Sequence, residues 1–347
     1  MSTQQQHTVI IPSAKAPLIV GPREVLIKVM SVALNPVDWA KHAHDFLIPE
    51  YPAVLGCDIA GVVEALGGGA GEFKKGDKVF VQTLSDGFQQ YTTAPAATVM
   101  PIPENVNFDE AATFPITFTT ACVGLFAPSP IGAGLNPTFS WDKPRQGESA
   151  LVIGAGTSHG ANPPLAIQLL KFSGFTRIVA YASKIHFDYL RELGATECID
   201  RAEVSIDSLA AHINAPVNVV YDGTDGGLNA AYDCLVNGGS IVAAQPRTKC
   251  DREGKKFTLI RAMGYIAGPE IFKVNAPTPL CPRPEHTTFG KLIMKNLPEM
   301  LAKRVIVGNR CEVLPNGLAG IPGALGRFGD AGVTGVKLVA HPQDPVA

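Results

Sequence analysis

Residues 150–156 read ALVIGAG, an uninterrupted apolar run that ends in glycines. A helix-forming stretch, PPLAIQLLKFSG, follows at residues 163–174, and a second apolar run, RIVAYAS, occupies residues 177–183. Strands buried on both faces read as continuous apolar runs, and helices between them imply a parallel sheet. The segment therefore predicts a strand–helix–strand unit with its glycines at the first turn.

The same alternation continues toward the C-terminus. Further helices are expected at 184–195 and 228–239, and further strands at 218–223, 240–245 and 263–268. The regular order predicts an α/β fold in which a doubly wound parallel sheet is covered by helices on both faces. A set of unrelated small α/β pieces is the alternative.

The first third of the chain has a different pattern. Short apolar runs at 24–34, 59–66, 77–83 and 88–95 are separated by turn residues such as Gly76-Asp77 and Asp86-Gly87. Such runs predict a compact barrel or a partly open β-sheet.

Two Pro-rich segments connect these parts. Residues 127–149 are rich in Pro, Gly and Ser and predict a long surface loop. Another Pro-rich stretch at 275–286 precedes an amphipathic helix at 288–303 and a strand at 336–341. We expect the tail to return to the first domain. The predicted β-rich domain therefore comprises residues 1–125 and 272–347, and the parallel-sheet domain residues 126–271.

Composition excludes several classes of protein. The 347 residues suit two domains, with 46% hydrophobic and 17% charged residues. A net charge of −2 gives no electrostatic basis for binding nucleic acid or an anionic membrane. No apolar run approaches the roughly 18 residues that cross a bilayer.

The N-terminus and the cysteines predict a cytoplasmic location. MSTQQQHTVII has neither the basic region nor the apolar segment of a secretion signal. The seven cysteines are scattered singly without a CxxC pair, which argues against a disulfide framework and a ribbon-type zinc site.

The glycine-rich turn predicts a dinucleotide site. Glycines after a buried strand let the backbone approach a pyrophosphate at a helix N-terminus. The candidate cofactor-binding residues in this turn are Gly154, Gly156, Thr157, Ser158 and Gly160. The spacing G-x-G-x-x-x-G and the following Pro163-Pro164 make the loop about three residues longer than usual, with the helix beginning near the prolines. A glycine-rich turn without a nucleotide is the alternative. His159 is either an exposed loop residue or a phosphate contact.

The end of the next strand favours NADPH over NADH. An NAD enzyme usually carries Asp or Glu there to accept the ribose 2′-hydroxyl. Here the strand ends in Ala182-Ser183-Lys184. Without a carboxylate to repel it, a 2′-phosphate can bind the hydroxyl of Ser183 and the ammonium of Lys184. A solvated role for Lys184 remains the alternative.

Several short motifs now carry a family resemblance over nearly the whole chain. They are Asn35-Pro36-Val37-Asp38, GCDIAG at 56–61, GDKV at 76–79, AATFP at 111–115 and Thr119-Thr120-Ala121. With them the chain resembles the zinc-independent quinone oxidoreductase branch of the medium-chain dehydrogenase/reductase superfamily. Within it, the chain is similar to fungal enoyl-reductase-like proteins, including trans-acting enoyl reductases that serve polyketide synthases. The resemblance implies a GroES-like catalytic domain, a Rossmann cofactor domain, a cleft between them and hydride transfer from NADPH.

Zinc-dependent relatives provide a contrast. They carry Cys near the Asn35 position and Gly-His-Glu near Gly56-Cys57-Asp58, and this chain replaces those ligands. Cys57 is better explained as a small buried residue. His42, His44 and Asp45 form a local cluster that we interpret as a surface loop. The sequence therefore predicts no metal site.

A conjugated acceptor is the substrate class that suits a metal-free site. Reduction of an isolated carbonyl needs a Lewis acid or a strong proton donor, whereas hydride added to the β-carbon of an enone, enoyl thioester or quinone leaves charge that spreads to oxygen. We therefore expect NADPH-dependent reduction of a conjugated C=C bond. A quinone oxidoreductase is one alternative, and a nucleotide-binding partner protein with little turnover is another.

The resemblance also implies site residues. Asn35 and Asp38 would line the cleft, although Asp38 could instead anchor a turn. A lysine that follows the NPxD motif in related enoyl reductases would polarise the substrate or hold the nicotinamide ribose, and Lys41 lies one residue beyond the matching count. Tyr51 is a pocket candidate. Thr119 and Thr120 would hydrogen-bond the nicotinamide, with helix packing as the alternative.

Overall fold

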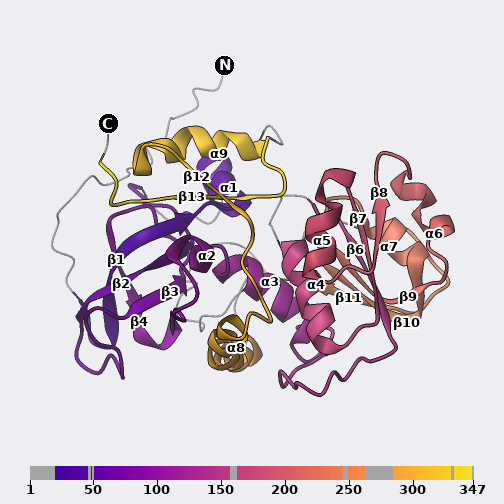
Figure 1. The fold of residues 1–347 in the computed structure, drawn as a ribbon, viewed down its shortest axis with the longest axis horizontal. Helices are drawn as coiled ribbons and strands as arrows, with labels where there is room; N and C mark the ends of the chain where they lie inside the picture. Colours follow the sequence, from indigo (N-terminus) through magenta and orange to yellow (C-terminus); the bar gives the residue numbers. More distant parts are fainter. Residues whose placement is uncertain are drawn as a thin grey trace.

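The computed structural model describes residues 20–45, 48, 51–156, 162–244, 249–262, 264, 284–329 and 332–345. Two sheets lie side by side and helix α3 (Pro115–Phe126) runs between them (Figure 1). The strands of the first sheet come from residues 24–101 and 311–340, and those of the second from 149–261. Domain boundaries at 125 and 272 stay predictions.

The first sheet is largely antiparallel. Its order is β12-β13-β1-β2-β3-β5, and β4 also pairs with β1. The strands are β1 (Glu24–Ala33), β2 (Asp58–Leu66), β3 (Lys78–Gln82), β4 (Tyr91–Pro95), β5 (Val99–Pro101), β12 (Cys311–Val313) and β13 (Lys337–Ala340). Burial alternates along most of β1, as expected for a strand with one face on a core. The pairing of β13 with β1 confirms that the C-terminal tail returns to this domain.

The second sheet is entirely parallel, in the order β11-β10-β9-β6-β7-β8. Its strands are β6 (Ser149–Ile153), β7 (Arg177–Ala182), β8 (Glu197–Asp200), β9 (Val217–Asp222), β10 (Leu235–Ala243) and β11 (Thr258–Arg261). The helices between them include α4 (Asn162–Ser173), α5 (Phe187–Leu193), α6 (Leu209–His212) and α7 (Leu228–Cys234). This is the predicted doubly wound fold. β8 and β11 were not foreseen, and the strand expected at 263–268 lies almost wholly outside the described residues.

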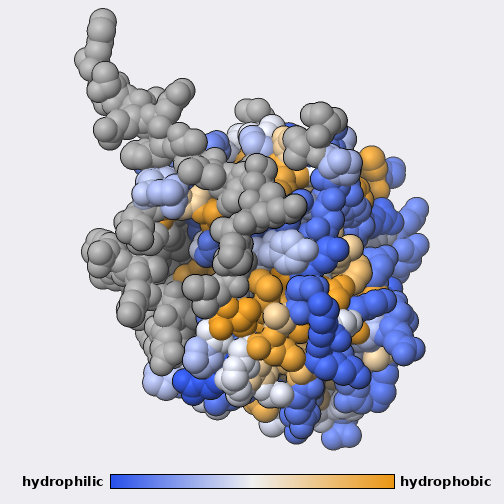
Figure 2. Space-filling model, turned by 90° about the vertical axis from the view of Figure 1, so that its left-hand side faces the viewer, coloured by the Kyte–Doolittle hydropathy of each residue, from blue (hydrophilic) through white to orange (hydrophobic). Residues whose placement is uncertain are grey.

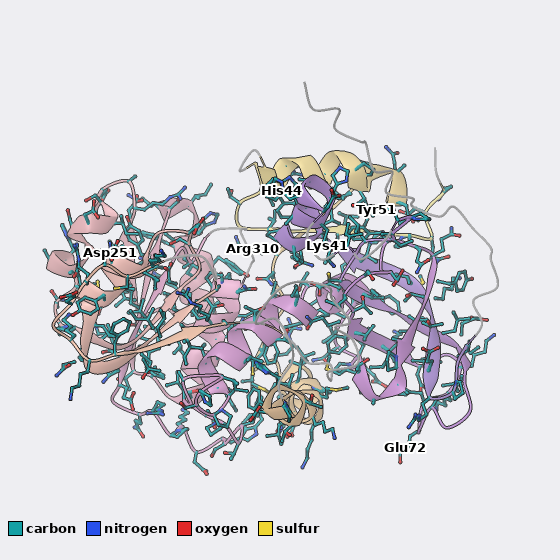
Figure 3. The ribbon with its side chains drawn as sticks, turned by 180° about the vertical axis from the view of Figure 1, so that it is seen from behind. Lys41, His44, Tyr51, Glu72, Asp251 and Arg310 are labelled. Carbon is teal, nitrogen blue, oxygen red and sulfur yellow. The ribbon has the colours of Figure 1, made fainter. Side chains whose placement is uncertain are left out.

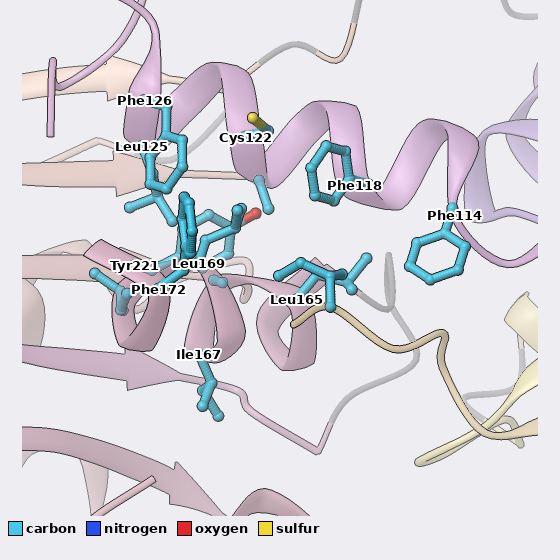
Figure 4. Packing of buried hydrophobic residues seen from close by; sticks show 14 of the residues in the cluster. Phe114, Phe118, Cys122, Leu125, Phe126, Leu165, Ile167, Leu169, Phe172 and Tyr221 are labelled. Atoms are coloured by element: carbon cyan, nitrogen blue, oxygen red, sulfur yellow. The ribbon is translucent and has the colours of Figure 1, made fainter. Parts of the chain in front are cut away.

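Helix α3 joins the two halves through an apolar contact with α4. Nearly every residue of α3 is buried, and Pro115 begins the helix where a missing N–H has no cost. Phe118 and Phe126 face Leu165 and Leu169 of α4 across this contact (Figure 4). The antiparallel and parallel sheets therefore share one continuous hydrophobic core.

The segment 127–149 corrects one expectation. Its residues 127–148 form no helix or strand, as predicted, but the segment is not simply a surface loop. Ile131, Leu135 and Phe139 are buried, and the ring of Phe139 lies 5.7 Å from that of Phe289 on α8 (Pro284–Ala302). Its Pro and Gly content correctly indicated irregular backbone, but the apolar side chains between them reach the core.

The remaining α-helices pack against the antiparallel sheet or against one another. They are α1 (Pro36–His44), α2 (Phe108–Ala112) and α9 (Ile321–Gly329), with α9 packed on α1 (Figure 1). At this end of the molecule an area of apolar residues is bordered by hydrophilic ones (Figure 2). Within the described ranges, no helix combines the length and apolar character needed to span a bilayer.

Candidate active site and cofactor cavity

A cavity of about 490 Å³ opens at the carboxyl edge of the parallel sheet. It lies where β6 is flanked by β7 on one side and β9 on the other, which is where doubly wound folds bind their ligands. Its lining comprises Ile153, Gly154, Gly156, Tyr181, Ala182, Ser183, Ile185, His186, Arg201, Ile206, Thr224, Asp225, Gly226, Val333 and Thr334. The last two residues come from the tail of the chain, so both domains contribute to the cavity.

Two of the predicted glycines form the inner wall of this cavity. Gly154 has a φ of +75°, which favours glycine. A Cβ on Gly156 would lie 2.2 Å from Cδ2 of His186, so no larger residue fits there without movement. Thr157, Ser158, His159 and Gly160 lie outside the described residues. Helix α4 begins at Asn162, with the two prolines in its first turn as predicted.

The cationic side chain in the cavity is not the one that we expected. Ser183 lines the cavity as predicted, whereas Lys184 is exposed and is not part of the described lining. Arg201 lines it instead. β8 pairs with β7 so that Asp200 lies opposite Ala182, which brings Arg201 close to Ser183. Recognising residues 197–200 as a strand would have revealed this arginine.

The cavity also has an apolar surface. Ile185 is 84% exposed, and Ile206 lies on the same lining. An exposed large aliphatic side chain gains free energy when a flat apolar ring covers it. Together with the glycine wall, Ser183 and Arg201, these isoleucines give the cavity the polar and apolar surfaces that a nucleotide would need.

Asn35 and Asp38 belong to a second group of polar residues, buried beside the antiparallel sheet. Asn35 precedes helix α1, and its backbone N–H donates to Asp38 Oδ2 at 2.9 Å. This contact satisfies a donor at the start of the helix. Asp38 is fully buried, its other oxygen accepts the thiol of Cys57 at 3.3 Å, and burial raises the pKa of its carboxyl group. The turn-anchoring interpretation of Asp38 agrees with these contacts.

Asp58 and Lys337 complete this buried group. Asp58 Oδ2 accepts the amide of Asn35 at 3.0 Å and the ammonium of Lys337 at 3.2 Å, and Lys337 also donates to Asn35 Oδ1. Asp58 Oδ1 accepts the backbone N–H of Ile116 at 2.8 Å, in the first turn of α3. Burial raises the pKa of Asp58, and Lys337 opposes that rise. Lys337 is 302 positions from Asn35, so no local pattern could indicate their contact.

Lys41 lies in the same group, beside Cys57, whereas Tyr51 contacts Asp45 outside it. Lys41 is 2% exposed, donates to the carbonyl oxygen of Leu84 and lies 3.5 Å from Cys57 Sγ. Cys57 is buried, as predicted, and burial and Asp38 raise the pKa of its thiol. Tyr51 is half-buried and donates to Asp45, and burial and Asp45 raise its pKa to about 12.

The group around Asp58 does not fit zinc. Asn35 offers an amide already bound to Asp58, Cys57 keeps a thiol whose raised pKa disfavours the thiolate, and Asp58 is paired with Lys337. Zinc prefers thiolate and imidazole ligands. His42 and His44 lie at the exposed end of α1, on a helix instead of the expected loop. Among described residues, no three His, Cys, Asp or Glu side chains form a group able to hold a metal.

Thr119 and Thr120 face the segment that follows β11. The Thr119 hydroxyl lies 2.8 Å from Gln82 Oε1 and 2.8 Å from the carbonyl of Pro115, and Thr120 donates to Ile116 O at 2.7 Å. Gln82 donates to the carbonyl of Gly264 at 2.7 Å, which connects the two domains. Both hydroxyls are therefore bound to groups of the protein, Thr120 within its own helix and Thr119 also to Gln82, and a role in binding the nicotinamide stays a prediction.

The fold and the cavity together define a class. An antiparallel sheet joined to a parallel sheet with a nucleotide-sized cavity at its carboxyl edge is the architecture of two-domain nicotinamide-dependent oxidoreductases. Residues 21–104 match the Alcohol dehydrogenase GroES-like domain family. The chain belongs to the medium-chain dehydrogenase/reductase superfamily, in the branch that includes fungal trans-enoyl reductases.

Its similarity to known proteins extends over different lengths. It is 32% identical to trans-enoyl reductase tazE of Aspergillus terreus over 86% of this chain and 94% of that protein. It is 35% identical to dehydrogenase orf1 of Aspergillus niger, where the match spans 58% of this chain and 59% of the relative. In fold it resembles the quinone oxidoreductase of Coxiella burnetii (TM-score 0.69, 23% identity, 94% and 92% covered). It also resembles the CurK enoyl reductase (TM-score 0.71, 20% identity, 95% and 94% covered).

Proposed function

We propose that this protein is a zinc-independent reductase that uses NADPH to reduce a conjugated C=C bond in an enone or enoyl thioester. The relatives named trans-enoyl reductase support the reaction class, and the match to tazE covers 94% of that protein's length. The cofactor and the absence of a metal are argued from this chain's own residues.

The cavity at the end of β7 is the observation that carries the proposal. The groups beside the expected ribose position are the hydroxyl of Ser183 and the guanidinium of Arg201. A guanidinium binds phosphate through two parallel hydrogen bonds, which suits the 2′-phosphate of NADPH. The carboxylate in the described lining, Asp225, follows β9 and lies away from the end of β7.

The buried group around Asp58 supports chemistry without zinc. The ammonium of Lys337 supplies the positive charge that balances the Asp58 carboxylate, and a metal would have to displace it. A substrate whose developing charge is delocalised has less need of a Lewis acid. This reasoning favours a conjugated acceptor over an isolated carbonyl.

The chain's own residues would orient the substrate and supply a hydrogen bond. When bound, the reduced nicotinamide provides the hydride. Tyr51 is the donor to the substrate oxygen that the family resemblance implies: its side chain is half-buried, its raised pKa of about 12 keeps the hydroxyl protonated, and the hydroxyl would exchange its bond to Asp45 for one to the substrate. Lys41 is buried and bound to Leu84, so we assign it to holding that loop.

Titration and turnover test the proposal in sequence. NADPH and NADH are titrated separately, and turnover is then measured with short enones, enoyl thioesters including carrier-bound ones, and quinones. Tight binding of NADPH with turnover of enones or thioesters supports the proposal. Turnover of quinones alone would make the protein a quinone oxidoreductase, and binding without turnover would make it a nucleotide-binding partner protein. A Tyr51→Phe variant with undiminished kcat would remove the tyrosine from the reaction.

A further inference from the structure

His186 is wedged between backbone segments of the two domains. On one side, a Cβ on Gly156 would lie 2.2 Å from Cδ2 of the imidazole ring. On the other, a Cβ on Gly335 would lie 2.4 Å from Cε1 of the same ring. Gly156 ends the described part of the glycine-rich turn, whereas Gly335 belongs to the tail just before β13. One side chain therefore fills the space between the two segments.

A second contact between the two domains lies close to His186 in the sequence. The guanidinium of Arg310, just before β12, lies 4.0 Å from the ring centroid of Tyr189 on α5. Figure 3 shows Arg310 between the two domains. The backbone N–H of Lys337 donates to the carbonyl of Arg310 at 2.7 Å, which holds this arginine beside the start of β13. The position of His186 between the two domains is thus supported by a cation–π contact between the same two domains.

The tail segment held in this way forms one wall of the cofactor cavity. Val333 and Thr334 line the cavity and immediately precede Gly335. Gly156 also lines this cavity. A displacement of the tail relative to the glycine-rich turn would change the width of the cavity.

We propose that His186 is a positioning residue that sets the distance between the glycine-rich turn and the tail segment 332–336, and thereby the affinity for the cofactor. The inference rests on the proposed binding of a nicotinamide dinucleotide. It concerns the affinity of the cavity for NADPH and for NADH alike. The role of His186 is steric, because the ring meets two glycines that have no side chain with which to bond it.

The charges around the ring agree with a steric role. Burial, Arg201 and Arg310 all lower the pKa of His186, so the imidazole is neutral at neutral pH. A neutral ring between two glycines brings no further charge into a cavity that already contains Arg201. Asp225 lines the cavity on the side of β9.

Two measurements on His186→Ala test the proposal. Dissociation constants for NADPH and NADH are obtained from nicotinamide fluorescence, and hydrogen exchange of residues 332–336 is followed without cofactor. We expect both dissociation constants to rise by a similar factor, on the order of tenfold, since a loosened wall affects both cofactors. Exchange in 332–336 should become faster. Asp188→Ala, on the exposed side of α5, is the matched control and should change neither quantity.

A double-mutant cycle tests the contact between His186 and Gly335. Gly335→Ala adds a methyl group that meets the imidazole and strains a backbone with φ +67°. In the His186→Ala background the clash disappears and only the strain remains. The Gly335→Ala effect on the dissociation constants should therefore be smaller in that background, and additive effects would overturn the contact.

The remaining outcomes separate the two proposals. A loss confined to NADPH would mean that His186 acts on the 2′-phosphate, and the positioning role would be wrong. Unchanged affinity and exchange in His186→Ala would also overturn it. If the wild-type protein bound neither nucleotide, the proposed function would fail, and the exchange of residues 332–336 would still decide whether His186 positions the tail.

Discussion

The two sheets use their polar residues in opposite ways. Beside the antiparallel sheet, Asn35, Asp58 and Lys337 satisfy one another at exposures of 3% or less. At the edge of the parallel sheet, Ser183 and Arg201 face a cavity. A polar group that is buried and fully paired stabilises one arrangement, whereas a polar group at a cavity wall keeps capacity for a ligand. The buried group beside the antiparallel sheet therefore stabilises the structure, whereas the residues at the edge of the parallel sheet are available to bind a ligand.

Asp58→Ala should give the largest effect and tests the first half of this contrast. Removing one member of a buried ion pair leaves the Lys337 ammonium without its carboxylate, which costs about 3–5 kcal/mol. Urea unfolding should show this loss. Arg327→Ala removes a pair with Glu312 at the surface and should cost less than about 1 kcal/mol. Similar losses of stability in the two variants would contradict a stabilising role for the buried pair.

Arg201→Ala tests the second half. The free energy of unfolding should stay within about 0.5 kcal/mol of wild type, since the residue faces a cavity. The dissociation constant for NADPH should rise by roughly 10- to 100-fold, as expected for a lost charge-assisted hydrogen bond of about 1.5–3 kcal/mol. Binding of NADH should be almost unchanged. Lys184→Ala should have a smaller effect on NADPH, and the reverse ranking would restore the lysine as the phosphate ligand.

The pH dependence of stability gives a further test at the cavity, through His186. His186 has a lowered pKa, so the unfolded chain binds its proton more tightly than the folded protein does. The stability contributed by neutral His186 is therefore present above its ordinary pKa of about 6.5 and is lost as pH falls below that value. A His186→Asn variant should show a shallower loss of stability between about pH 7 and about pH 5. Parallel curves for the variant and the wild type would contradict this sign.

A chelator should have the smallest effect of all. Because Lys337 pairs with Asp58 and the Cys57 thiol stays protonated, we expect no stoichiometric zinc by elemental analysis. Activity and melting temperature should not change after dialysis against a chelator. About one zinc per chain, or activity lost to the chelator and restored by zinc, would show that the buried group is a metal site.

Local sequence patterns predicted most of the fold, because strand and helix periodicities are properties of short segments. The run at 150–156, the alternation after it and the returning tail strand at 337–340 are all present. The strand Glu197–Asp200 was missed because it is short, half-buried and has a charged residue at each end. Pro and Gly in 127–149 correctly indicated irregular backbone. Because such composition is typical of surface loops, the burial of Phe139 was not predicted.

The candidate site could be predicted only in part, for a different physical reason. Gly154, Gly156 and Ser183 were found because a turn after a buried strand constrains residue types locally. Arg201 and Lys337 reach their partners through strand pairing, which sequence spacing does not encode. Lys41 matched a family position, but its depth of burial depends on packing that no motif specifies.

The segment 127–149 has a consequence for engineering the protein. Residues 131–139 supply apolar groups to the core shared by both sheets, so shortening that portion would open a cavity beneath α3. Further along, Gln146 and Gly147 are exposed, and a Cβ on Gly147 would meet no atom within 4 Å. A reporter peptide or fluorescent label inserted between Gln146 and Gly147 should leave the fold intact, whereas the same insertion next to Phe139 should not.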